Sequence, residues 1–282
     1  MRDLANKTES CAINTATLGF QAPIKEVIDA VARHGFGAIA PWRRELQGQD
    51  VRVIGRHIRD AGLKVTGLCR STYLPAPDAQ QRQANITDNI NALEIAAELG
   101  ADYFALVVGS MWHGGKDIDS ARLQVGDGIA ALLTHAQRLG VRLALEPLHP
   151  VYAVDRSCIN TLAQALDLCE TIEKGPAAPW LGVLVDAYHV WWDPALAQEI
   201  MRAKKRIFGF HVSDWLVPVG DVLNDRGLMG DGVLDLPKIR SMVETAGYDS
   251  FIEAEIFSTE NWWKRPMDQT LSIARERFST CV

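Results

Sequence analysis

Eight short apolar segments recur along the chain, each followed by a longer amphipathic segment, and this alternation limits the possible folds most strongly. Alternating strands and helices imply parallel strands joined by right-handed crossovers. Eight such units favour closure into a barrel over an open sheet. The predicted strands are residues 11–17, 38–42, 64–70, 103–109, 142–148, 181–189, 207–214 and 250–257.

The segments between these strands carry apolar residues at helical spacing. The clearest stripe is Ile24, Val27, Ile28 and Val31, and the others are Ile90, Leu93, Ile95 and Ala97; Leu162, Ala165, Leu166 and Cys169; and Ile239, Met242, Val243 and Ala246. A glycine follows several of these stripes, where a helix ends in a left-handed residue. These glycines are Gly62, Gly100, Gly140 and Gly247.

An open doubly wound sheet is the alternative to a barrel, but it usually has a glycine-rich phosphate loop after its first strand. Residues 17–19 contain a single glycine, and no linker or composition break divides the chain. We therefore predict an α/β protein, a (β/α)8 TIM barrel, forming one domain over residues 1–282. Residues 1–10 are expected to be a polar N-terminal extension.

Charge and cysteine content exclude several classes of protein. The net charge is −6, and the chain has no run of lysine or arginine. It therefore lacks the clustered positive charge through which proteins bind nucleic acid. The five cysteines include no CxxC pair, which argues against a disulfide framework or a zinc knuckle. Neither a secretory h-region nor a membrane-spanning apolar run is present. We expect a cytoplasmic protein with no nucleic-acid or membrane partner.

Predicted strands five to eight each carry a metal-binding type of side chain near the C-terminal end, where TIM barrels place their active sites. These residues are Glu146, Asp186, His211 and Glu255. Three converging carboxylates would repel one another unless a cation neutralised them. The set predicts one divalent cation, Mn²⁺ or Mg²⁺ first, with Co²⁺ or Zn²⁺ as alternatives. A purely structural ion network is the competing interpretation.

Glu253 shares strand parity with Glu255, so both can face the barrel interior. Glu253 would then lie one layer deeper, where a buried carboxylate needs a partner. Arg142 is one possible partner, because it has the same parity as Glu146 on the fifth strand.

The chain resembles the xylose isomerase-like barrel superfamily, through the runs LALEPLHP, VLVDAYHVWWDP, GFHVSDW, GLMGDGVLDLPKI and FIEAEIFS. Within it, the chain is most similar to sugar phosphate isomerase/epimerase proteins, which include inosose isomerase and dehydratase, hydroxypyruvate isomerase and ketohexose 3-epimerases. The element order matches throughout, whereas the specific motifs lie from Glu146 onward. The apurinic endonuclease branch needs further histidines, and residues 41–43 and 69–71 contain none.

The resemblance implies roles for six residues. It implies that Glu146, Asp186, His211 and Glu255 ligate one divalent ion, and that the two glutamates act as acid and base. It also implies that His189, three residues after Asp186, and Arg226, ahead of a Gly-Asp-Gly, contact the substrate.

Further residues near the predicted strand ends are candidates for the same site. His149 could contact the substrate, and both His149 and Asp214 could orient other groups or relay protons. A backbone-bonded loop histidine and a cap are the alternatives. Trp112 and His113 follow the fourth strand and could line the pocket or be exposed. Tryptophans could form aromatic walls for a sugar or an oligomer interface: Trp42, Trp112, Trp191, Trp192, Trp215, Trp262 and Trp263. We assign Trp262 and Trp263 to the interface or rim, and expect a homodimer or homotetramer.

A substrate with a carbonyl beside a hydroxyl suits these residues. A divalent cation can polarise the carbonyl, and a carboxylate can remove the neighbouring proton to give an enediolate. Returning the proton to the adjacent carbon isomerises the substrate, and returning it from the opposite face epimerises it. We predict an isomerase or epimerase of a small sugar-like molecule. A lyase or dehydratase acting on a keto-sugar or cyclitol is the alternative, and a non-catalytic sugar-binding barrel is a third possibility.

Overall fold

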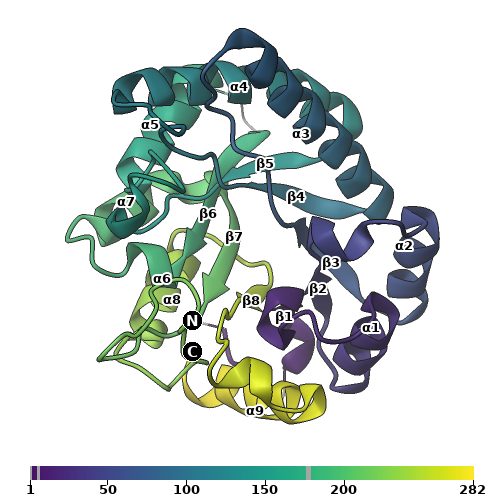
Figure 1. Ribbon diagram of the computed structural model, residues 1–282. Coiled ribbons are helices and arrows are strands. Elements are labelled where there is room, and N and C mark those ends of the chain that lie inside the picture. Colours follow the sequence, from purple (N-terminus) through teal and green to yellow (C-terminus); the bar gives the residue numbers. More distant parts are fainter. Residues whose placement is uncertain (1, 5–6, 176–178) are drawn as a thin grey trace.

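The computed structural model describes residues 2–4, 7–175 and 179–282, and it confirms a single-domain (β/α)8 barrel (Figure 1). Eight parallel strands close in sequence order, with β8 pairing β1. The strands are β1 Cys11–Asn14, β2 Ala38–Ala40, β3 Lys64–Leu68, β4 Ala101–Leu106, β5 Arg142–Leu145, β6 Leu181–Asp186, β7 Ile207–Val212 and β8 Ile252–Ala254. Of the expected extension, residues 1, 5 and 6 lie outside the described part.

Helices surround this barrel as an outer ring (Figure 1). The α-helices are α1 Ile24–Arg33, α2 Val51–Asp60, α3 Ala79–Leu99, α4 Ile118–Leu139, α5 Leu162–Ile172, α6 Ala187–Val190, α7 Leu196–Ala203, α8 Leu236–Thr245 and α9 Met267–Thr280. The short 3-10 helices are η1 Thr8–Ser10, η2 Thr15–Leu18, η3 Arg43–Leu46, η4 Pro150–Tyr152, η5 Lys204–Arg206 and η6 Trp262–Lys264. No helix among the described residues is long and apolar enough to cross a membrane.

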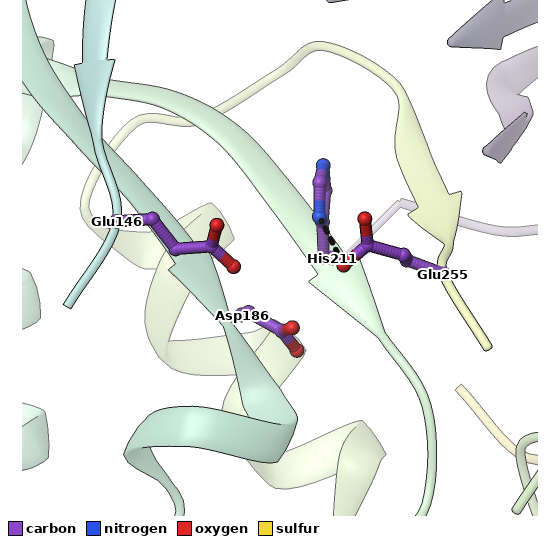
Figure 2. Close-up of side chains that lie close together, drawn as sticks. All are labelled: Glu146, Asp186, His211 and Glu255. Atoms are coloured by element: carbon purple, nitrogen blue, oxygen red, sulfur yellow. Dashed lines mark ion pairs between the residues drawn. The ribbon is translucent and has the colours of Figure 1, made fainter. Parts of the chain in front are cut away.

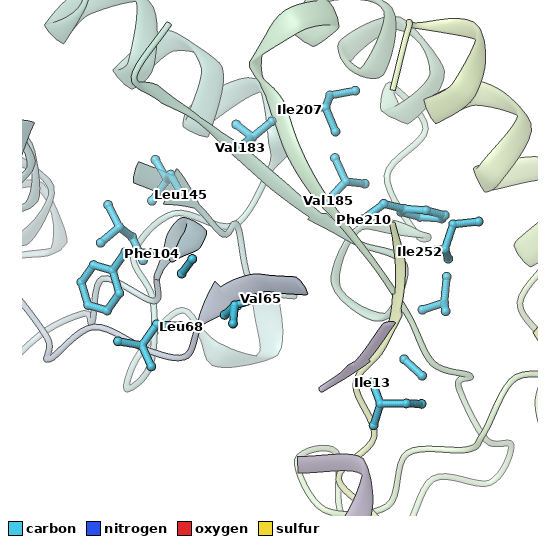
Figure 3. Packing of buried hydrophobic residues seen from close by; sticks show 14 of the residues in the cluster. Ile13, Val65, Leu68, Phe104, Leu145, Val183, Val185, Ile207, Phe210 and Ile252 are labelled. Atoms are coloured by element: carbon cyan, nitrogen blue, oxygen red, sulfur yellow. The ribbon is translucent and has the colours of Figure 1, made fainter. Parts of the chain in front are cut away.

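The predicted helical stripes face the strands. The Ile24, Val27, Ile28 and Val31 stripe of α1 is buried, as expected from its spacing. Of the stripe predicted on α3, only Leu93 is buried, whereas Ile90, Ile95 and Ala97 are partly buried. The other buried residues of this helix are Asn89, Ala92, Ala96 and Leu99. Figure 3 shows outward-facing strand residues of the same core, from Ile13 on β1 to Ile252 on β8.

Helix ends follow the predicted glycine positions. Gly62, Gly100, Gly140 and Gly247 all have positive φ, between 73° and 101°. Each glycine therefore turns the chain from a helix toward the next strand without the steric cost that a Cβ would add.

Several strands end earlier than predicted, because their last residues turn into the loops at the barrel mouth. β6 stops at Asp186, whose carboxylate accepts a hydrogen bond from the Tyr188 amide (2.9 Å) and caps the one-turn helix α6. β5 stops at Leu145 and β8 at Ala254. As a result, Glu146 and Glu255 are each the first residue beyond a strand, at the rim where polar groups can converge.

Candidate metal centre

Four side chains from adjacent barrel elements meet at this mouth. Glu146 follows β5, Asp186 ends β6, His211 lies on β7 and Glu255 follows β8. Each offers one ligand atom, and the four atoms lie within 4.8 Å of one another (Figure 2). All four residues are buried, with at most 5% of their surface exposed. Their grouping is the one that the strand-end pattern predicts, and three oxygen ligands with one nitrogen suit a divalent cation.

The orientation of His211 fits such a cation. Its Nε2 lies 3.1 Å from Glu253 Oε1 and 3.0 Å from the Tyr103 hydroxyl. Its buried Nδ1 has no hydrogen-bond partner in the described part of the chain, and it lies 3.5 Å from Glu255 Oε2. A proton on Nε2, donated to Glu253, would leave the Nδ1 lone pair facing the three carboxylates.

Glu253 lies beneath the cluster, and its partners differ from the one considered in the sequence. Its carboxylate accepts hydrogen bonds from Asn14 Nδ2 (2.9 Å) and Thr66 Oγ1 (2.5 Å) as well as contacting His211. Arg142 as the partner is wrong: its guanidinium stacks on Phe208 (4.6 Å), because it begins β5 at the opposite end of the barrel. Burial opposes ionisation of Glu253, but His211 and these hydrogen bonds hold its pKa below the ordinary value.

The carboxylates above it are electrostatically strained without a cation. Burial, reinforced by repulsion from Glu255 and Asp186, raises the pKa of Glu146 to about 8. Burial also raises the pKa of Asp186, although Arg226 opposes the shift. For His211, burial disfavours the charged form, but attraction to Glu253 and Glu255 outweighs it and raises the pKa well above the usual range. A divalent cation would relieve the repulsion and favour the ionised carboxylates.

Arg226 and His189 lie against this cluster, as the resemblance implied. Arg226 Nη1 is 3.1 Å from Asp186 Oδ2 and 3.5 Å from Glu255 Oε2, and its Nη2 is 3.2 Å from His189 Nε2. His189 Nε2 lies 3.9 Å from Glu146 Oε1. Burial and the adjacent Arg226 charge lower the pKa of His189 well below its ordinary value, so the imidazole is neutral at physiological pH.

His149 and Asp214 support the surrounding loops. The His149 backbone N–H donates to His189 Nδ1 (3.3 Å), while its ring stacks near Trp215 and accepts from the Val151 amide (3.2 Å). Its imidazole is thus a backbone-bonded loop histidine in this structure.

The Asp214 carboxylate accepts hydrogen bonds from three backbone N–H groups, those of Trp215, Gly230 and Leu234, each at 2.9 Å. These bonds hold the loop that carries Arg226. Gly232 lies against the same carboxylate, where a Cβ would come within 2.6 Å of Asp214 Oδ1.

The aromatic residues divide between the mouth and the core. Trp42 packs edge-on against Phe257 (5.4 Å between ring centroids), and its Nε1 donates to Asn14 Oδ1 (2.6 Å). Trp262 is only 2% exposed and donates to Asp231 (2.7 Å), so its assignment to an interface or rim is wrong. It is a core residue because η6 turns its ring inward, whereas the half-buried Trp263 packs near Phe257.

A cavity of about 390 Å³, part of it open to solvent, connects these groups. It is lined by Trp42, Cys69, Arg70, Val107, Glu146, Leu148, Tyr152, Arg156, His189, Leu223, Arg226, Glu255 and Phe257. Trp112 is half-buried and His113 exposed, and neither lines the cavity, so their substrate contacts stay a prediction.

The sequence interpretation missed Arg70 and Arg156 as cavity residues. Arg70 ends a predicted strand, so the strand-end rule that gave the candidate metal ligands could have identified it. Arg156 reaches the cavity because the loop after β5 folds back, with Ser157 bridging Gly109 beyond β4. No local sequence pattern signals that approach.

This fold and site define a TIM barrel with a buried carboxylate–imidazole group at its C-terminal mouth. Residues 28–276 match the family described as xylose isomerase-like TIM barrel. The chain therefore belongs to the xylose isomerase-like TIM barrel family.

Individual relatives agree with this family. The chain is 22% identical to an inosose isomerase of Bacillus velezensis over 280 residues, which cover 95% of both proteins. It is 26% identical to an inosose isomerase of Bacillus licheniformis over 165 residues, and this match spans 57% of the chain and only 55% of that relative's length.

Two solved structures show the same fold. Protein SMc04130 from Sinorhizobium meliloti 1021 superposes with a TM-score of 0.93 at 51% identity, covering 98% of this chain and 99% of that one. The IOLI protein with a bound zinc atom superposes with a TM-score of 0.82 at 20% identity, covering 97% and 98%.

Proposed function

We propose that this protein binds one divalent cation through Glu146, Asp186, His211 and Glu255 and isomerises or epimerises a small sugar-like molecule. The observation that carries the proposal is the convergence of four buried ligand atoms within 4.8 Å at the barrel mouth. The inosose isomerases among its relatives support this reaction class, and the zinc atom bound by the IOLI protein supports a divalent cation. Mn²⁺ and Mg²⁺ remain the first candidates, with Co²⁺ and Zn²⁺ as alternatives.

When bound, such a cation polarises a substrate carbonyl and makes the neighbouring C–H more acidic. Glu146 and Glu255 then act as the base and the acid that transfer this proton. Figure 2 shows these carboxylates on either side of Asp186 and His211, so one can remove a proton and the other can return one from the opposite side. Return to the same carbon inverts its configuration, and return to the neighbouring carbon moves the carbonyl.

Two further side chains orient the substrate in this proposal. Neutral His189 has Nε2 within 3.9 Å of Glu146 Oε1 and 3.7 Å of Asp186 Oδ2, where it can contact a substrate oxygen. Arg226 bridges Asp186 and Glu255 and thereby fixes the directions of both carboxylates. Trp42 and Phe257 supply the apolar wall on which sugar C–H groups can pack.

A panel of ketoses, inososes and 3-keto-glycosides incubated in D₂O with the Mn²⁺-loaded protein tests the proposal. We expect deuterium incorporation beside a carbonyl and a product of unchanged skeleton, whereas a dehydratase would yield a product lighter by one water. Glu146→Gln should abolish the exchange while preserving the circular-dichroism spectrum, because Gln keeps the shape but cannot accept the proton. Near-normal exchange in this variant would contradict the assigned role.

A further inference from the structure

Two arginines of the cavity wall have no assigned task in the proposed reaction. Arg70 and Arg156 line the same cavity as Glu146 and Glu255. Their guanidinium groups rest on aromatic rings, Arg70 4.7 Å from the centroid of Tyr73 and Arg156 5.6 Å from that of Tyr152. In the described part of the chain, neither guanidinium lies within 4.0 Å of a carboxylate oxygen. Neither arginine therefore forms an ion pair in that part of the chain, and Arg70 Nη1 donates only to the backbone carbonyl of Ser71 (3.2 Å).

The chain treats other half-buried arginines differently. Arg43 pairs with Asp88 at 2.8 Å, Arg206 with Glu173 at 3.1 Å and Arg277 with Asp231. Pairing is the usual arrangement, since a charge that loses water needs a compensating group. Leaving Arg70 and Arg156 unpaired, within one cavity, is consistent with a compensating charge that arrives with a ligand.

The two arginines also act on each other. Burial lowers the pKa of Arg70 and the positive charge of Arg156 lowers it further, while Tyr73 and Glu146 oppose the shift. Arg70 additionally lines an open groove beside the cavity, together with Arg43 and Thr72. Its guanidinium thus stands between the cavity and solvent, where it can meet a group on the end of a substrate that points away from the carboxylate cluster.

The formal charges of the site with a divalent cation bound also favour an anionic ligand. The three ligand carboxylates and Glu253 carry four negative charges, against three positive charges from a divalent cation and Arg226. When the positive charges of Arg70 and Arg156 are added, the formal charge of the site sums to +1. A monoanionic ligand would cancel it, and arginine forks bind carboxylate and phosphate oxygens in pairs.

We propose that the substrate carries an anionic group, a carboxylate or a phosphate, that Arg70 and Arg156 bind while its carbonyl end faces Glu146 and Glu255. This inference rests on the proposed function, because the carbonyl end is placed by the metal-binding group. It narrows the substrate class from neutral sugars to sugar-like keto acids or keto phosphates. Charge balance favours the carboxylate.

Three matched probes test this inference by calorimetry with Mn²⁺-loaded protein. Dihydroxyacetone, hydroxypyruvate and dihydroxyacetone phosphate all have a carbonyl beside a hydroxyl, but they end in a neutral, a carboxylate and a phosphate group respectively. We expect an anionic probe to bind at least about tenfold more tightly than dihydroxyacetone, as two charge-assisted contacts warrant. The tighter of the two anionic probes identifies the group that the arginines receive.

Substitutions test whether Arg70 and Arg156 cause the preference for anionic probes. Arg70→Gln and Arg156→Gln should each reduce the ratio of anionic-probe affinity to dihydroxyacetone affinity severalfold, while Arg70→Lys and Arg156→Lys should retain part of that ratio. Arg265→Gln is the matched control, because Arg265 also rests on an aromatic ring, that of Trp262 (4.1 Å), but lines neither the cavity nor the groove. Equal affinity for all three probes, or a preference that survives both Gln substitutions, would overturn the inference.

Mn²⁺ binding is measured before any probe is added, which separates this test from that of the proposed function. If Mn²⁺ does not bind, the proposed function fails. If Mn²⁺ binds and the three probes bind equally, only the anionic group is wrong.

Discussion

His211 Nε2 lies 3.1 Å from Glu253 Oε1, and this contact turns the other ring nitrogen toward the carboxylates of the candidate metal centre. Glu253 is in turn held by Asn14 from β1 and Thr66 from β3. Hydrogen bonds thus connect β1 and β3, through Glu253 on β8, to the imidazole on β7. Because this contact directs the imidazole, Glu253 belongs to the candidate metal centre together with the four side chains that could hold a cation.

Replacing Glu253 should therefore weaken metal binding without removing a ligand. We expect Glu253→Gln to lower Mn²⁺ affinity about 10- to 100-fold, the usual effect of losing a group that orients a ligating histidine. Titration calorimetry on the folded variant measures the change. Exposed Glu260→Gln serves as the control and should bind like the unaltered protein. Unchanged affinity in Glu253→Gln would show that His211 orients itself without this contact.

Metal binding should also compete with protons near neutral pH. In the metal-free site the pKa of Glu146 is about 8 and that of His211 is raised well above 6.5, so both groups hold a proton at pH 7. Ligation requires both to lose it. Mn²⁺ affinity should consequently rise as pH increases from 6 toward 8 and fall in the other direction, by about tenfold per pH unit for each displaced proton.

Calorimetry in buffers of different ionisation enthalpy counts the protons released. Release of one to two protons per ion at pH 7 is the expected result. An affinity that stays constant between pH 6 and pH 8, with no proton release, would contradict the protonation states assigned to Glu146 and His211.

Asp214 should matter for stability and for the position of Arg226, although it touches no ligand. Its carboxylate receives three backbone N–H groups of the loop that carries Arg226. Asp214→Ala should lower the free energy of unfolding by about 2–5 kcal/mol, because it leaves these donors without their charged acceptor. Asp214→Asn keeps one oxygen and should lose less. Urea unfolding measures both, and equal stability of all three proteins would disprove the anchoring role.

Much of the fold followed from the sequence, because periodicity reports burial directly. The eight strands and the glycines that end the helices lie where pattern and punctuation place them. The predicted ends of the strands were less accurate, because residues such as Asp186 begin caps and turns that an apolar run does not reveal. Trp262 was misassigned because a tryptophan pair near a strand end says nothing about which ring η6 turns inward.

Some residues of the candidate site could likewise be predicted from the sequence, and others could not. Glu146, Asp186, His211 and Glu255 could be found because each interrupts an apolar strand end on consecutive strands. The partners of Glu253 could not, because Asn14 on β1 and Thr66 on β3 are far from Glu253 in the sequence, and only closure of the barrel, with β8 pairing β1, brings them together. Arg156 depends on a loop that folds back, which leaves no periodic signal.

The melting temperature of the metal-free protein, with and without added Mn²⁺, tests the central claim most directly. The ligands come from four barrel elements that only folding assembles, so a bound ion stabilises the native state, by about 2.7 kcal/mol at a free concentration one hundred times the dissociation constant. We predict that EDTA lowers the melting temperature, that Mn²⁺ restores it, and that His211→Ala loses most of this rise. A melting temperature indifferent to both EDTA and Mn²⁺, or the same rise in His211→Ala, would contradict the account.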